Sequence, residues 1–201
     1  MTRSMIYRGG LTREQFLFYE MRIAARYYQR AIPVDDAVAE ITAENLFQFP
    51  TEREVRSIAR ACYRRLEALN NAALVQELID APSDIAKQIN LYAIMRDNRL
   101  VWEFMVDLIG EKYRQLDFSL TRQDINTFMT HLQAENDTIA AWSESTIKKI
   151  KSVLVRCLVE TGYLESHRDT TLHPVFLDDA LLEGIRANND KPALAAFNYF
   201  E

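Results

Sequence analysis

The sequence predicts an all-α protein: a helical bundle followed by a winged helix-turn-helix-like C-terminal module with a short β-hairpin. Glycine and proline are sparse, five of each in 201 residues, and apolar residues recur at helical spacing over long stretches. Beyond about residue 115 the pattern changes to two capped helices and two short strand-like segments. We therefore expect a bundle over 1–115 and a winged module over 116–201, with packing into one compact unit as the alternative.

Helices account for the whole of the first range. Thr12 is a plausible N-cap with Gln15 three residues on, so a helix is expected from there to about Ala31, before Pro33. Thr51 caps a second strong candidate, with Glu52 and Glu54 in its first turn. Further helices are expected over about 35–47, from 72 to 81, and over 83–115 as one or two long segments.

The second range begins with "SLTRQDINTFMTHLQAEN", which predicts a capped helix of about 15 residues. A helical turn, "DTIAAW", leads to "SESTIKKIKSVLVRCLVETG", a longer helix that Gly162 ends. "YLESHRDTTLHPVF" is interpreted as two short strands about a polar turn. This order of elements is typical of a winged helix-turn-helix module.

Composition gives few global clues to function. The formal net charge of −5 gives no general attraction to nucleic acid, but 13 of the 14 basic side chains in residues 1–100 are arginines. Cys62 and Cys157 lie on apolar helix faces, which predicts buried, reduced thiols. The N-terminal stretch has no signal-peptide core, and no run reaches about 18 apolar residues, so we expect a cytoplasmic protein without a membrane partner.

The segment "TEREVRSIARACYRRLEAL", residues 51–69, carries a stripe of cations. At about 100° per residue, Arg53, Arg56, Arg60 and Arg64 fall within an arc of about 80°, opposite the apolar face. Guanidinium groups suit phosphate, because they stay charged and present two parallel donors. The alternative is a solvated face neutralised by nearby acids, since Glu52 and Glu67 lie at ion-pairing distance along the helix.

A second polar face follows on the predicted last long helix, made up of Ser145, Lys148, Lys149, Ser152 and Arg156. A recognition helix has this distribution, with a wet N-terminal half and a C-terminal half wedged into its domain. The first turns lack Arg, Asn and Gln, so backbone contact with DNA is expected rather than base reading. Winged modules also serve as protein-contact domains, which remains the alternative.

No enzyme is predicted. The three histidines, His131, His167 and His173, have no metal-site spacing, and no nucleophile elbow, phosphate loop or dinucleotide fingerprint occurs. The acid pairs Asp35–Asp36 and Asp178–Asp179 are interpreted as charges at helix N-termini rather than a nuclease site. We accordingly expect no catalytic residues, no metal and no cofactor.

Three short motifs resemble the BrxA proteins of BREX phage-defence systems: "RGGL" before an aromatic helix, "W-S-x-S-T-x-K-K" from Trp142, and "L-V-E-T-G-Y-L". The resemblance runs the length of the chain. It implies a small helical protein, similar in part to the NusB antitermination fold, that acts without catalysis beside a DNA methyltransferase and other large subunits. Family members are associated with DNA binding.

Two hypotheses follow. In the first, the chain is an antiviral-defence accessory that grips the backbone of double-stranded DNA with the arginine stripe and the later lysine face. In the second, it is an adaptor that assembles other BREX subunits without touching DNA, and an exposed apolar patch would favour this one. The C-terminal "ALAAFNYFE" is a candidate for such a patch.

Overall fold

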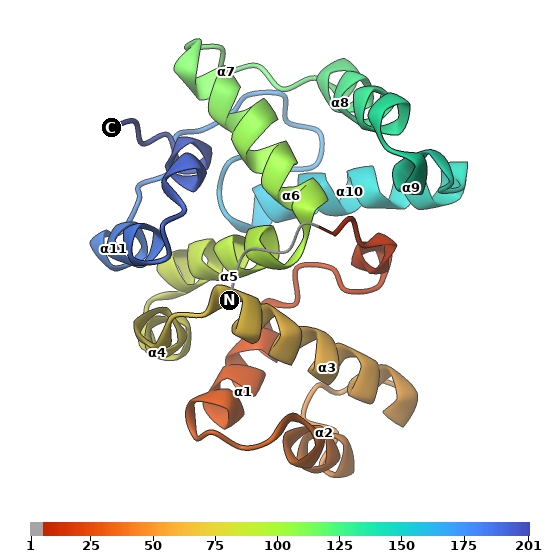
Figure 1. The fold of residues 1–201 in the computed structure, drawn as a ribbon, viewed down its shortest axis with the longest axis vertical. Coiled ribbons are helices and arrows are strands. Elements are labelled where there is room, and N and C mark those ends of the chain that lie inside the picture. The colour runs from red at the N-terminus through yellow and green to blue at the C-terminus, as the bar shows by residue number, and fades with distance from the viewer. Residues whose placement is uncertain (1–5) are drawn as a thin grey trace.

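The computed structural model describes residues 6–201, and every regular element within that range is helical (Figure 1). The first five residues of the predicted bundle, and with them part of the stretch expected to lack a signal peptide, lie outside the described residues. The α-helices are α1 (Phe18–Gln29), α2 (Val34–Ala43), α3 (Glu52–Leu69), α4 (Ala72–Asp80), α5 (Ser83–Asp97), α6 (Arg99–Glu103), α7 (Glu111–Arg114), α8 (Arg122–Glu135), α9 (Asp137–Ala140), α10 (Glu144–Glu160) and α11 (Asp179–Ala187). Two 3-10 helices, η1 (Gly9–Thr12) and η3 (Lys191–Phe197), and one π-helix, η2 (Phe104–Gly110), complete them.

Helix α5 occupies the middle of the molecule. Every residue from Gln88 to Asp97 is buried, which an amphipathic surface helix cannot achieve. Figure 1 shows α5 between the group α1–α4 and the later helices. The helical bundle expected from the sequence fits this arrangement.

The helix starts with strong capping residues are confirmed. Thr51 accepts from the amide of Glu54, Ser143 accepts from that of Thr146, and Thr121 forms a reciprocal capping box with Asp124. The start predicted at Thr12 is wrong. Thr12 ends the short η1, and α1 begins at Phe18 after Leu17, whose φ of 53° is left-handed.

The predicted winged module with its β-hairpin is wrong. Among the described residues no strand forms over 163–176, and a single antiparallel bridge joins Thr171 to Ser119. The carboxylate of Asp169 accepts from the backbone amides of Glu165 and Thr171, which closes the segment into a side-chain-held turn. Pro174 then removes a further backbone donor. Local side-chain bonds therefore replace the expected ladder.

Later elements pack directly on the early helices. In α11, Gly184 lies so close to Leu74 of α4 that an added Cβ would meet its side chain at 2.5 Å. Asp190 accepts from Arg96 at 2.6 Å and from the hydroxyl of Tyr92 at 2.8 Å, both from α5. The division at residue 115 stays a prediction, and these contacts cross it.

Candidate nucleic-acid interface

The N-terminal two turns of α3 display the exposed part of the arginine stripe. Val55, Ile58 and Cys62 are buried on one side of the helix, which turns Arg53 and its neighbours outward. The side chain of Arg53 has no hydrogen bond or ion pair with any residue from 6 to 201. It is therefore available to a ligand.

Arg56 and Arg60 have surface partners. Arg56 donates to Glu52 at 2.8 Å and Arg60 donates to Asp35 at 2.8 Å, and the two arginine side chains remain 58% and 57% exposed. Exposed pairs of this kind contribute about 0–1 kcal/mol, so a phosphate can compete with either carboxylate. The solvated-face alternative thus describes part of the stripe.

The side chain of Arg64 points toward the interior of the protein and binds two carboxylates. Its Nε donates to Asp97 at 2.9 Å, and its other donors reach Asp97 again and Glu14. Burial opposes the charged form, but the hydrogen bonds to Asp97 outweigh it and raise the pKa of the guanidinium. The structure therefore separates Arg64 from the other three arginines.

Helix α10 presents the second predicted face. Ser145, Lys148, Lys149 and Ser152 are exposed, and neither lysine has a partner within the described chain. Arg156 instead donates to Gln15 Oε1 at 2.5 Å and lies 3.9 Å from Glu160, so it is only partly available.

One side chain from each face, Arg53 and Lys149, lines a common depression. Trp142, just before α10, packs its indole on Gly9 of η1, where an added Cβ would lie 3.6 Å from the ring. This contact joins the "RGGL" and "W-S-x-S-T" stretches and packs η1 against α10, on the side of α10 that faces α3 (Figure 1). We call the resulting depression, of about 340 Å³, the interhelical groove. Its lining includes Arg13, Gln15, Arg53, Glu54, Ser57 and Lys149.

Sequence reasoning missed Arg13, which belongs to the same groove. Its side chain is exposed and has no partner in the part of the chain that the structure describes. The residue follows η1 and lies outside any periodic helical row, so a helix wheel gives no signal for it. Glu54 is the one acid that lines the groove, against the three cations Arg13, Arg53 and Lys149.

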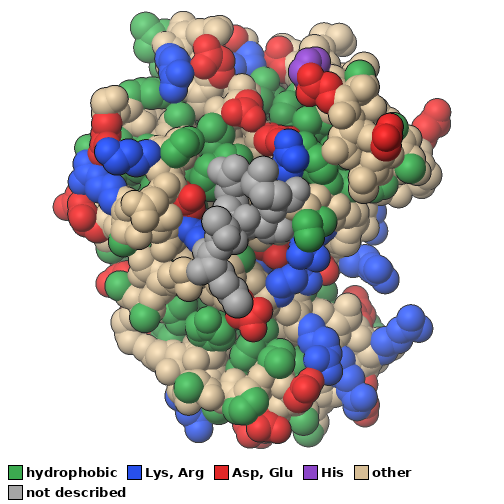
Figure 2. Space-filling model, viewed as in Figure 1, with side chains coloured by type: hydrophobic (Ala, Val, Ile, Leu, Met, Phe, Trp, Pro, Cys, Tyr) green, Lys and Arg blue, Asp and Glu red, His purple; other side chains and the backbone are tan. Residues whose placement is uncertain are grey.

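Figure 2 shows Lys and Arg side chains gathered along the right-hand flank of this view, on both sides of a hollow. Acidic side chains are interspersed among them, as the pairs of Arg56 and Arg60 require. The local excess of cations contrasts with the formal net charge of −5 of the whole chain.

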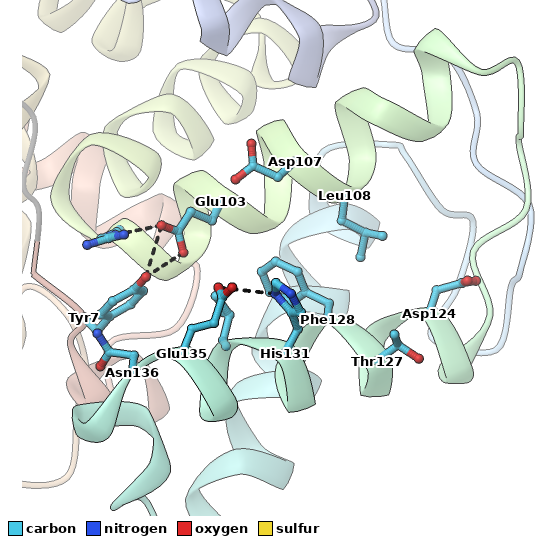
Figure 3. A pocket seen from close by; sticks show the side chains of 12 residues that line it. Tyr7, Glu103, Asp107, Leu108, Asp124, Thr127, Phe128, His131, Glu135 and Asn136 are labelled. Atoms are coloured by element: carbon cyan, nitrogen blue, oxygen red, sulfur yellow. Dashed lines mark hydrogen bonds and ion pairs between the residues drawn. The ribbon is translucent and has the colours of Figure 1, made fainter.

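A different cavity, of about 640 Å³, lies between η2 and α8 and is acidic (Figure 3). The Tyr7 hydroxyl donates to Glu103 at 2.8 Å, Arg99 donates to Glu103 at 2.7 Å, and His131 lies 3.4 Å from Glu135. Burial and the carboxylate of Glu103 raise the pKa of Tyr7 to about 12. Such a surface repels phosphate. No group of three or more potential metal ligands gathers anywhere in residues 6–201.

The acid pairs named in the sequence occupy helix starts. Asp35 and Asp36 lie in the first turn of α2, and Asp178 is the N-cap of α11, where it accepts from the amide of Ala180. Their interpretation as helix N-terminal charges is confirmed.

Comparison with known proteins decides the family. The BrxA family model matches residues 5–189. The chain belongs to the BrxA family. That match includes both stretches that meet at Gly9 and Trp142, and it confirms the family resemblance seen in the sequence motifs.

Relatives of this BrxA-family chain come from several bacteria. "BREX protein BrxA" of Bacillus cereus is 29% identical over 94% of this chain and 95% of its own length. The protein of the same name in Paramagnetospirillum magneticum is 22% identical over 86% of each chain. The Escherichia coli protein of that name is 27% identical over 69% of this chain and 64% of its own. The chain is thus a BREX component.

A crystal structure of an uncharacterized protein from Magnetospirillum magneticum has the same fold, with a TM-score of 0.81 over 95% of this chain and 97% of that one, at 21% identity. No described helix has both the length and the apolar run needed to cross a bilayer. The similarity to the NusB fold stays a prediction.

Proposed function

We propose that this BrxA-family chain binds double-stranded DNA through the sugar–phosphate backbone, as a non-enzymatic accessory of a BREX phage-defence system, with little sequence specificity. The observation that carries the proposal is the meeting of Arg13, Arg53 and Lys149 at one groove, each exposed and without a carboxylate partner in the described chain. Lys148 extends this set along α10.

The other residues that we propose to contact DNA are those whose side chains are exposed and weakly paired. Arg56 and Arg60 can exchange weak surface partners for phosphate, and the hydroxyls of Ser145 and Ser152 can donate to it. Arg156 contributes if it leaves Gln15. Arg64 is left out of the proposed set, because its donors are occupied by Asp97 and Glu14.

Contact with the DNA backbone explains why the exposed side chains at the groove are lysines and arginines. Lysine and arginine neutralise phosphates and release counterions, a sequence-independent source of affinity. The exposed face of α10 has no Arg, Asn or Gln before Arg156 that could form a bidentate hydrogen bond with the edge of a base. Specificity in the defence system would then come from the other BREX subunits, beside which we propose that this chain works.

The test is fluorescence anisotropy with a labelled, random-sequence 30-base-pair duplex in low salt. Arg53→Glu combined with Lys149→Glu should weaken binding at least tenfold, because two attractions become repulsions. The matched control is Arg26→Glu with Arg30→Glu, which makes the same change in net charge on exposed side chains in the last turn of α1 and at its C-cap. Equal loss in both double variants would contradict a contact located at the groove. The adaptor alternative predicts no binding by the wild type.

A further inference from the structure

A second cavity, of about 340 Å³, adjoins the interhelical groove and is lined in part by aromatic rings. The cavity and the groove share Arg13, Gln15, Glu54 and Ile58 in their linings, so they lie next to each other. We propose that this aromatic cavity takes an unpaired nucleobase of DNA, while the groove holds the adjoining backbone. The inference rests on the proposed DNA binding and deepens it, because it names the form of DNA that the chain prefers.

Two aromatic rings on the wall of the cavity are only partly covered by neighbouring side chains. Tyr19 is 76% exposed, although it follows the buried Phe18 at the start of α1. Its hydroxyl has no hydrogen-bond partner in residues 6–201. Phe49 lines the same cavity half-buried, and its ring meets that of Phe47 edge-on at 6.1 Å. Exposed rings beside cations are the platform on which proteins stack single-stranded bases.

The backbone that carries these groups is held rigidly. The buried Arg65 donates to the carbonyls of Gln15 at 3.0 Å and Glu14, and Asn90 donates to the carbonyl of Phe16 at 2.7 Å. Leu17 then turns the chain in the left-handed region, which a leucine adopts only when its surroundings impose it. Tyr19 is thus presented from a fixed turn, which lowers the entropy lost on binding.

Charges in the cavity favour a base over a phosphate. Arg13 and Arg156 line it and can reach a backbone outside. Three acids also line it. Glu160 pairs with Lys87 at 3.0 Å, whereas the carboxylates of Glu20 and Glu54 have no ion pair with any described residue. A carboxylate repels phosphate but accepts hydrogen bonds from the amino groups of nucleobases. The volume lies at the small end of ligand pockets, which run from about 300 to 1,000 Å³.

A base in an intact duplex is stacked and paired, so entry requires its extrusion. That cost is least where the base is already unpaired. The chain should therefore bind a duplex that contains a bulge or an overhang more tightly than a blunt duplex of the same length. Such DNA arises wherever strands are opened or damaged.

The experiment compares two probes by anisotropy: a blunt 30-base-pair duplex, and the same duplex with a three-nucleotide bulge that carries 2-aminopurine. Wild-type protein should bind the bulged probe about tenfold more tightly, within the range that stacking of one base provides. The 2-aminopurine fluorescence should fall on binding, because the base stacks on a ring.

Tyr19→Ala should abolish both the preference and the fluorescence change, with blunt-duplex affinity unaltered, whereas Tyr19→Phe should keep them. The control Phe176→Ala changes another exposed ring, 80% exposed, outside the cavity. Equal wild-type affinity for the two probes, or equal loss for both in Tyr19→Ala, would overturn the proposal. Binding to neither probe would remove the proposed function as well, whereas binding to the bulged probe alone would remove only the duplex function.

Discussion

Arg64 donates from Nε to both carboxylate oxygens of Asp97, at 2.9 and 3.2 Å, and so links α3 to the end of α5. Its Nη2 donates to Glu14, just after η1, and to Asp97 as well. The Asp97 side chain is only 5% exposed, and that of Arg64 is 30% exposed. The last arginine of the arginine stripe is therefore a structural residue that ties α3 to α5 and to the segment after η1.

Arg64→Ala should lower the free energy of unfolding by about 3 kcal/mol, the lower end of the range for breaking a buried ion pair, because it leaves the buried Asp97 with only the longer contact to Arg8, at 3.8 Å. Arg60→Ala is the matched control, since its pair with Asp35 is exposed and should contribute at most about 1 kcal/mol. Urea denaturation measures both. An equal loss of unfolding free energy in the two variants would show that the Arg64–Asp97 pair contributes no more than an exposed pair.

Gly184→Ala should destabilise the packing of α11 on α4. The new Cβ would meet three side-chain carbons of Leu74 at 2.5–2.7 Å, and overpacking of this kind costs about 1–3 kcal/mol. Leu74→Ala in the same chain should relieve the clash, so the double variant should be more stable than the sum of the single effects predicts. Strict additivity in thermal or urea unfolding would argue against this contact.

Asp169 should make the stability of the 163–173 segment dependent on pH. The amides of Glu165 and Thr171 donate to its carboxylate and lower its pKa below the unfolded value of about 3.9. Because the folded pKa is the lower one, the contribution is complete above about pH 5 and is lost as the pH falls through the folded pKa.

Asp169→Asn should consequently reduce the free energy of unfolding at pH 7, and the gap from wild type should narrow between pH 5 and pH 2. Urea titrations at pH 7, 5, 3 and 2 provide the comparison. A gap that stays constant over this range would mean that ionisation of Asp169 does not stabilise the fold.

Both thiols should be unreactive in the folded protein. Cys62 and Cys157 are buried, as the sequence predicted, and burial raises the pKa of each thiol to about 12. The thiolate is the reactive form. A chromogenic disulfide reagent at pH 8 should therefore label neither cysteine in native protein and both in urea. Rapid release of one equivalent of chromophore in the absence of urea would contradict the burial of the two thiols.

Sequence patterns predicted those features that depend on neighbours within a few residues. The cap predicted at Thr51 acts within one helical turn and is confirmed. The helix predicted to be capped near the start of the second range has its cap at Thr121, and the structure adds a cap at Ser143 for α10. The start at Thr12 failed because Arg65 and Asn90, distant in sequence, hold the carbonyls of residues 14–16 in a non-helical path.

Tertiary partners decided the rest. On a helix wheel Arg64 is equivalent to Arg60, and only the position of Asp97 distinguishes them. The β-hairpin failed because the carboxylate of Asp169 captures backbone amides that strands would use. Arg13 carried no periodic signal, and its place beside Lys149 depends on the contact of Trp142 with Gly9. The expected apolar tail is largely buried in η3, from Ala193 to Phe197.

The salt dependence of duplex binding tests the central claim most directly. Four unpaired cations, Arg13, Arg53, Lys148 and Lys149, joined by up to three weakly paired ones, should give a log–log slope of association constant against salt between about −4 and −6. Arg53→Ala with Lys149→Ala should make that slope about 2 less steep, since each phosphate contact contributes about 0.9. A wild-type slope near zero, or one that the two substitutions leave unchanged, would contradict backbone binding at the interhelical groove.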